Sequence, residues 1–228
     1  MKKCLRRLSM VCALTVLLFS FPVQAESGRK QLALTFDDGP SIHTEKLLDF
    51  LKEQGIHATF FLVGERVPNY PETVRREAAE GHELGYHSYF HNDQTLLSSE
   101  RIFDEFCRAD RELYRLTGRE YSLWRAPGGS FNKRVLEAVP LPHIHWSADT
   151  RDWETKNTAA VCSAILESAG DGVIILLHDL YATSVDGAIR AIKSLQKQGF
   201  EFVTVSELLS RHGEPPENCM NYYKTPPS

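Results

Sequence analysis

Cysteine is scarce in this chain, and its spacing excludes the usual cysteine-based metal sites. The 228 residues contain five cysteines and no Cys-x-x-Cys pair, which excludes zinc-finger spacing. Cys4 and Cys12 fall in the N-terminal stretch, leaving Cys107, Cys162 and Cys219 for the folded protein. Three cysteines cannot all pair within one chain, so one disulfide with a free thiol and three unpaired thiols are both open alternatives.

The chain also lacks an apolar run long enough for a transmembrane helix. Met10–Phe21 is almost wholly apolar, but it is well short of the roughly 20 residues that span a bilayer. Basic residues precede this run, and the small-residue ending Val23–Ala25 follows it, an order typical of an export signal. We therefore expect residues 1–25 to be a signal peptide of an exported protein with no stable membrane anchor after cleavage. The alternative is a retained N-terminal anchor.

Positive charge is in deficit throughout the rest of the chain. The 26 Lys and Arg face 30 Asp and Glu, and loss of the predicted signal leaves 22 basic against 30 acidic residues, a net charge of −8. Nucleic acids and anionic membranes both bind through clustered cations, so neither is expected as a partner. No repeat or low-complexity linker interrupts residues 30–211, which predicts one domain, and we expect a monomer.

Apolar strand-like runs alternate with helix-period segments along the domain. The predicted strands are residues 32–36, 58–63, 83–86, 122–124, 144–147, 173–177 and 202–204. The predicted helices are residues 43–54, one beginning at Pro71, 99–116, 133–138, 159–168, 185–198 and 207–211. This alternation indicates an α/β fold with parallel strands and crossover helices, and about seven units favour a barrel over a six-stranded open sheet. Residues 214–228, rich in Pro and Asn, are expected to form a surface tail.

Polar residues gather where the predicted strands end. The residues concerned are Asp37 and Asp38, His87, Arg125, Asp149, and His178 with Asp179. The carboxyl ends of parallel barrel strands open onto one face, where active sites are built from the following loops. Five separate chain segments therefore deliver acids, bases and an arginine to the same mouth.

Two of these segments have the composition of a metal site. His87 and His91 are four residues apart, and on a helical turn they would share one face and chelate a divalent cation. One carboxylate of Asp37 and Asp38 could complete a three-ligand site with an open position for water, while the other accepts a proton. The alternatives are an ordinary Asp-Gly turn before Pro40 and a pair of surface histidines.

The remaining polar residues suggest acid–base chemistry. Arg125 could hold a neighbouring carboxylate ionised and oriented, or form a structural salt bridge. His178 is a candidate general acid because the pKa of imidazole lies near neutrality. An acidic neighbour would favour its protonated form, and from these residues alone Asp149, Asp152 and Asp179 remain equal candidates.

In this order, the motifs resemble those of polysaccharide deacetylases of carbohydrate esterase family four, the NodB-like domain. The matching segments are Thr35–Pro40, His87–His91, Arg125–Gly129, Asp149–Trp153 and Leu176–Asp179. The resemblance spans residues 31–211 and implies a distorted (β/α) barrel. It implies a catalytic domain over residues 26–213.

The resemblance also assigns the metal ligands and the groups that move protons. It makes Asp38, His87 and His91 the ligands of a divalent metal, most often zinc in the family, with Co²⁺ or other metals as alternatives. It makes Asp37 the general base, tethered by Arg125.

On the opposite side of the reaction, the resemblance makes His178 the general acid, tuned by Asp152. Substrate or oxyanion contacts are implied for Gly128, Trp153 and Leu176, with the backbone N–H near Gly128 stabilising the oxyanion. Position 128 is glycine where many family members carry tyrosine, so the wall beside the acetyl methyl is expected to be missing.

These expectations converge on an exported hydrolase that removes N-acetyl groups from N-acetylglucosamine units of a polysaccharide. Peptidoglycan is the preferred substrate, with chitin-type glycans next. A xylan O-acetyl esterase of the same family is the nearest alternative, and a glycan-binding protein without activity is another. The expected location is secreted, periplasmic or associated with the cell wall.

Overall fold

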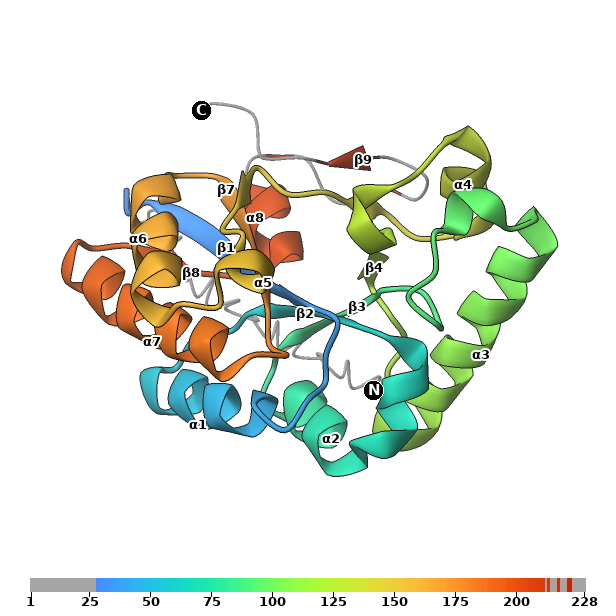
Figure 1. The fold of residues 1–228 in the computed structure, drawn as a ribbon, viewed down its shortest axis with the longest axis horizontal. Coiled ribbons are helices and arrows are strands. Elements are labelled where there is room, and N and C mark those ends of the chain that lie inside the picture. Colours follow the sequence, from blue (N-terminus) through green and yellow to red (C-terminus); the bar gives the residue numbers. More distant parts are fainter. Residues whose placement is uncertain (1–27, 212, 214–216, 218–220, 223–228) are drawn as a thin grey trace, which may run out of the picture.

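Parallel strands form the centre of the fold, and helices lie around them (Figure 1). The computed structural model describes residues 28–211, 213, 217, 221 and 222, so the predicted signal and most of the predicted tail lie outside the described residues. The strands are β1 (Gln31–Asp37), β2 (Thr59–Leu62), β3 (Glu83–Tyr86), β4 (Leu123–Trp124), β5 (His143–Ile144), β6 (Ala148–Asp149), β7 (Val173–His178), β8 (Glu201–Phe202) and β9 (Asn221–Tyr222). The α-helices are α1 (Thr44–Gln54), α2 (Pro71–Ala79), α3 (Ser99–Thr117), α4 (Lys133–Ala138), α5 (Asp152–Thr155), α6 (Thr158–Ser168), α7 (Ala182–Lys197) and α8 (Val205–Arg211). Short 3₁₀ turns cover Gly64–Asn69, Gln94–Leu96 and Pro127–Gly129.

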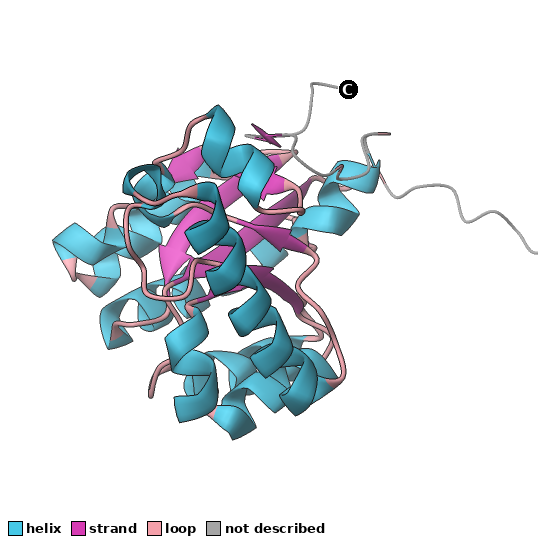
Figure 2. Ribbon diagram, turned by 90° about the vertical axis from the view of Figure 1, so that its right-hand side faces the viewer, coloured by secondary structure: helices cyan, strands magenta, loops and turns pink. Residues whose placement is uncertain are grey.

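The strands form one parallel sheet that curls into a barrel with open edges. Their order is β6-β7-β1-β2-β3-β4-β5-β9, and β8 pairs with the start of β1. The seven strands from β6 to β5 are enclosed by helices, which Figure 2 shows from the side. The predicted single-domain α/β fold, a distorted (β/α) barrel of about seven parallel strands, is therefore confirmed.

Strand register decides which side chains face the interior of the barrel. On β1, Leu32, Leu34 and Phe36 pack in the main core, which includes residues of the surrounding helices, whereas Ala33 belongs to a second, inner core. Because side chains alternate along a strand, Asp37 points to the same side as Ala33. The other members of the inner core come from β2, β4, β5, β7 and α8.

The same alternation holds for β7, the neighbour of β1. Ile174 lies in the inner core, so Leu176 and His178 also face inward. Asp37 pairs in register with His178, at the last residue of each strand. Two ionisable side chains are thereby placed next to each other at the mouth of the barrel.

Local signals set the helix ends as predicted. The hydroxyl of Ser98 caps α3 by accepting the N–H of Arg101 at 3.2 Å, and α3 ends at Gly118 in the left-handed region, with φ of 71°. Glycine adopts this conformation without a steric cost, which explains the stop. Pro71 occupies the first turn of α2, where its missing N–H costs nothing.

The strand predicted over residues 144–147 is wrong as a single element. β5 ends at Ile144 and pairs with β4, whereas β6 begins at Ala148 and pairs with β7 at the other edge of the sheet. The intervening residues cross the open side of the barrel and carry Trp146. The N–H of His145 bonds to the carbonyl of Tyr222 in β9, whereas the N–H of Ser147 bonds to the carbonyl of Ile174 in β7, so the segment passes from one strand neighbour to another and forms no continuous strand.

The cysteine and membrane questions are answered for the described residues only. Cys107 in α3 and Cys162 in α6 are free thiols. Cys219 lies outside the described residues. Within the described part of the chain, no helix has the length and apolarity needed to cross a membrane.

We expect substitution of Gly85, inside the barrel, to destabilise the fold. A Cβ atom at this residue would lie 2.4 Å from Phe61 and 2.9 Å from Leu123. Overpacking of this kind costs about 1–3 kcal/mol, so Gly85→Ala should lower the urea midpoint. Gly28→Ala is the control because a Cβ there meets nothing within 4 Å. Equal midpoints for the two variants would contradict the packing described here.

Candidate active site and metal centre

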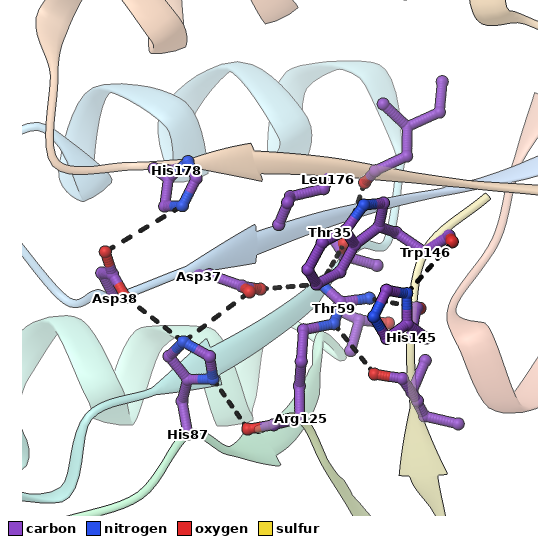
Figure 3. A network of polar contacts seen from close by, with 12 residues as sticks. Thr35, Asp37, Asp38, Thr59, His87, Arg125, His145, Trp146, Leu176 and His178 are labelled. Atoms are coloured by element: carbon purple, nitrogen blue, oxygen red, sulfur yellow. Dashed lines mark hydrogen bonds and ion pairs between the residues drawn. The ribbon is translucent and has the colours of Figure 1, made fainter. Parts of the chain in front are cut away.

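A pocket of about 370 Å³ opens at the carboxyl end of the barrel strands. Its lining residues are Asp37, Asp38, His87, His91, Gly128, Trp146, Asp149, Trp153, Leu176, His178 and Tyr181. The sequence-predicted site residues are all among them except Arg125, Asp152 and Asp179, which are fully buried. Arg125 and Asp152 contact lining residues from behind. Figure 3 shows several of these side chains converging on Asp37 and Asp38.

Three potential metal ligands converge on one side of this pocket. One ligand atom each from Asp38, His87 and His91 can be chosen so that all lie within 4.8 Å of one another. The Nε2 atoms of His87 and His91 are 3.3 Å and 2.9 Å from Oδ1 of Asp38. A carboxylate and two imidazoles are a donor set that suits a catalytic zinc-type ion.

Contacts behind the triad support this fit. Nδ1 of His87 lies 2.8 Å from the carbonyl oxygen of Arg125, which can only accept, so Nδ1 carries the proton. In the neutral ring Nε2 then has a lone pair aimed toward the Asp38 carboxylate. A cation bound between Nε2 of His87 and the carboxylate of Asp38 would stabilise both lone pairs. In metal sites, the second nitrogen of a ligating histidine usually donates to a backbone carbonyl or a carboxylate, as Nδ1 of His87 does here.

The pKa values of the triad show how protons and a cation would compete. Burial alone would raise the pKa of Asp38, but in the absence of a cation the neighbouring imidazoles of His87 and His91 hold it far below its ordinary value. The hydrogen bond to Asp38 raises the pKa of His91, against the effect of burial. Metal binding must displace these protons, so affinity for the metal should weaken as the pH falls.

The two histidines reach the site from a loop, which corrects the expected helical turn. Residues 87–93, after β3, form no helix, and Ser88 and His91 both have positive φ, 59° and 57°. The hydroxyl of Ser88 accepts the N–H of His91 at 2.8 Å, and its carbonyl accepts the N–H of Gly64 at 3.0 Å. A folded loop tied to the next segment thus produces the proximity that a helix would have given.

Arg125 holds Asp37 from inside the barrel. Its Nη1 donates to Oδ1 of Asp37 at 2.7 Å and to the hydroxyl of Thr35 at 2.7 Å. Its other nitrogens donate to the carbonyls of Ile144 and His145 at 3.0 Å and 2.9 Å. Burial lowers the pKa of Arg125, and the charge of Asp37 opposes that shift. Oδ2 of Asp37 is left facing the triad, 3.7 Å from Nε2 of His87.

His178 is held by Asp152, the partner that sequence alone could not select. Oδ1 of Asp152 lies 2.8 Å from Nδ1 of His178, and Oδ2 accepts the backbone N–H of His178 at 2.8 Å. Burial alone would lower the pKa of His178, but the bond and charge of Asp152 and the charges of Asp37 and Asp38 raise it to about 9. The other candidates are engaged elsewhere: Asp149 accepts the N–H of Arg151, and Asp179 accepts the hydroxyl of Thr44.

The rest of the pocket wall is largely apolar. Leu176 is buried, whereas Trp153 is 46% exposed at the rim. Trp146 stacks on the ring of His145 with centroids 3.9 Å apart. Tyr181 was missed by the sequence analysis, although it follows a predicted strand on the same loop as His178. An exposed indole beside polar groups suits contact with a sugar ring.

A carboxylate–histidine triad beside a carboxylate held by Arg125 and an imidazole held by Asp152 has the composition of a metal-assisted hydrolase site. The chain belongs to the polysaccharide deacetylase family, whose family model matches residues 24–141. It is 40% identical over 180 residues to the peptidoglycan-N-acetylglucosamine deacetylase PgdA of Listeria monocytogenes, covering 78% of this chain and 39% of that protein. The chain therefore spans only about two fifths of that relative's length.

Two further relatives resemble the chain over most of their own length. A chitooligosaccharide deacetylase of Bradyrhizobium is 36% identical over 201 residues, covering 80% of this chain and 92% of that protein. A family 4 acetyl xylan esterase from Clostridium thermocellum, in complex with a cobalt ion, superposes with a TM-score of 0.82 at 29% identity, covering 87% of this chain and all of that one. The family thus includes amide and ester substrates.

We expect metal binding to depend on the triad and not on Asp37. Asp38→Ala, His87→Ala and His91→Ala should each weaken Zn²⁺ binding by on the order of 100-fold or more, because each removes a ligand from a three-ligand site. Asp37→Asn is the matched control and should keep the metal, since its Oδ1 is engaged by Arg125. Calorimetric titration of the metal-free proteins measures both. Loss of the metal from Asp37→Asn alone would mean that the two aspartates have exchanged roles.

Proposed function

We propose that the protein is an exported, metal-dependent hydrolase that removes N-acetyl groups from N-acetylglucosamine units of a polysaccharide, with peptidoglycan preferred over chitin-type glycans. The observation that carries this proposal is the pairing of two oppositely tuned groups across the triad. Arg125 donates a hydrogen bond to Oδ1 of Asp37 and fixes that carboxylate, whereas Asp152 raises the pKa of His178 and fixes its ring. Hydrolysis of an amide needs a proton acceptor for water and a proton donor for the amine.

Asp38, His87 and His91 would hold the ion, and Zn²⁺ suits their donor set. When bound, such a cation lowers the pKa of water and polarises the acyl oxygen. Oδ2 of Asp37 faces the triad and accepts the proton of the attacking water. Nε2 of His178, 4.0 Å from Oδ2 of Asp38, donates a proton to the departing amine, which is too basic to leave without one. The backbone N–H of Gly128 is assigned to the developing oxyanion.

The choice of substrate rests on the similar proteins and on the predicted export of the chain. The similarity to a peptidoglycan-N-acetylglucosamine deacetylase at 40% identity supports peptidoglycan, and the predicted signal supports export to the wall. Trp153 and Leu176 are assigned to substrate contact, the former with a sugar ring and the latter with the acyl group. The likeness to an acetyl xylan esterase makes acetylated xylan the competing substrate.

We expect the metal-loaded protein to release acetate from peptidoglycan and from chitooligosaccharides faster than from acetylated xylan. Acetate is measured on each glycan before and after exhaustive chelation, and chelation should abolish release. Asp37→Asn should lose about 10²–10⁴-fold in turnover while keeping its metal, the usual contribution of a general base. Full activity after verified metal removal would refute the proposed mechanism. Faster acetate release from acetylated xylan would make xylan, rather than peptidoglycan, the preferred substrate.

The pH profile should report the Asp152–His178 pair. His178 must be protonated to donate, so activity should persist below the pKa of His178, which Asp152 raises, and fall as the pH rises through it. A bound cation offsets the charges of Asp37 and Asp38, which leaves Asp152 as the main carboxylate that raises this pKa. Asp152→Asn should therefore move the alkaline limb of kcat/KM to lower pH, by about one unit or more.

The matched control for this shift is Glu154→Gln, which removes the same charge from the same short helix. Glu154 pairs with Arg151 at the surface and does not contact His178. Its alkaline limb should coincide with that of the unmodified protein. If Asp152→Asn left the limb in place as well, His178 would not be the titrating acid.

A further inference from the structure

In the loop after β4, the space around Gly128 is open and the space around Gly129 is closely packed. A Cβ atom at Gly129 would lie 2.8 Å from the rings of both His145 and Trp146. At Gly128, with φ of 59°, a Cβ atom would meet no atom within 4 Å. Gly128 nevertheless lines the pocket that holds the triad. The pocket wall is therefore open beside Gly128, where any other residue would place a side chain.

The sheet order indicates which part of a substrate faces this gap. Within the proposed function, the amide nitrogen must lie beside His178, at the end of β7, because His178 protonates it. β1, the neighbour of β7, delivers Asp38, and β3, two strands further along the sheet, delivers the two histidines; the loop with Gly128 follows β4, beyond β3. The acyl chain leaves the carbonyl on the side away from the nitrogen, and so points away from His178.

The side chains on that side fit an alkyl group. In Figure 3, Leu176 and Trp146 lie on the opposite side of Asp37 from His178 and Asp38. Both are apolar lining residues, and Leu176 is only 4% exposed. An acyl methyl would contact these two side chains, and further carbons would extend into the open space beside Gly128.

We propose that Gly128 leaves the acyl pocket open, so that the protein hydrolyses N-propionyl and N-butyryl amides of glucosamine units as well as N-acetyl amides. The inference rests on the proposed function and concerns the acyl group that the same site accepts. In each case water supplies the new C–O bond and the C–N bond breaks. Asp37 takes a proton from the water and His178 gives one to the nitrogen, so the products are a carboxylate and an amine, with no redox step.

The test compares chitotetraose derivatives that differ only in their N-acyl group, using the zinc-loaded full chain. Amine release gives kcat/KM for the acetyl, propionyl and butyryl substrates. We expect the propionyl value to lie within about threefold of the acetyl value, because an open wall imposes no clash. An extra methylene in a closed hydrophobic pocket changes such ratios by about 10–200-fold.

A matched pair of variants assigns the effect to Gly128. Gly128→Asn fills the gap with a residue that tolerates positive φ, and should lower the propionyl-to-acetyl ratio at least tenfold. Gly118→Asn is the control, because Gly118 has φ of 71°, also meets nothing within 4 Å at its Cβ, and lies at the end of α3 away from the pocket. Its ratio should equal that of the unmodified protein.

Binding gives a readout that does not depend on turnover. In the Asp37→Asn background, the Kd values of the acetyl and propionyl substrates should be similar, and addition of Gly128→Asn should weaken the propionyl complex at least tenfold more than the acetyl complex. Circular dichroism establishes that the variants are folded, and the ratio in the unmodified protein needs no variant at all.

The outcomes separate the inference from the function on which it rests. Acetyl release with propionyl release more than about 100-fold slower would overturn the open pocket and leave the deacetylase intact. Equal losses on all acyl groups in Gly128→Asn would overturn it too, by placing the gap beside the sugar chain. Release of no acyl group from any glycan by the metal-loaded protein would overturn the proposed function itself.

Discussion

The guanidinium of Arg125 lies in the interior of the barrel, and the site is arranged around it. Its side chain fixes Asp37 on β1, and its own carbonyl fixes the tautomer of His87 after β3. One residue thus positions both the proposed base and the first metal ligand. Removal of one partner from a buried ion pair costs about 3–5 kcal/mol, because the other charge is left without compensation. Its remaining N–H groups reach the carbonyls of Ile144 and His145, so the edge of the barrel is held by the same cation.

The two proposed proton-transfer groups, Asp37 and His178, differ in the charge of the side chain that holds each of them. Asp37 lies against a permanent cation, and His178 lies against the anion of Asp152. Because Asp37 and His178 end adjacent strands in register, this division needs no movement of the backbone.

Much of the barrel and of the site could be predicted from sequence, since both depend on local patterns. The run from Leu32 to Asp37 is apolar and then abruptly acidic, which marks a buried strand and its carboxyl end. Positions that depend on tertiary packing were less accessible. The helical turn expected for His87 and His91 is a loop, because Ser88 ties it to Gly64.

The segment that crosses the open side of the barrel and the partner of His178 also depend on tertiary structure, so neither could be predicted from local sequence patterns. Residues 144–147 have the composition of a strand, but only the three-dimensional sheet order shows that they bridge two edges. Residue types and spacing alone do not distinguish Asp149, Asp152 and Asp179 as partners of His178. The fold selects Asp152 because the first residue of α5 lies against both the ring and the backbone N–H of His178.

Packing also explains motif residues that take no part in the chemistry. Asp179 is fully buried, and burial raises its pKa to about 7. Its backbone carbonyl accepts the hydroxyl of Ser41 at 2.6 Å, and its carboxylate accepts that of Thr44. A Cβ atom on Gly39 would lie 2.4 Å from the same carboxylate, so only glycine fits there. The loop that carries Asp38 is thereby joined to the loop that carries His178, and the metal side and the acid side of the pocket cannot shift independently.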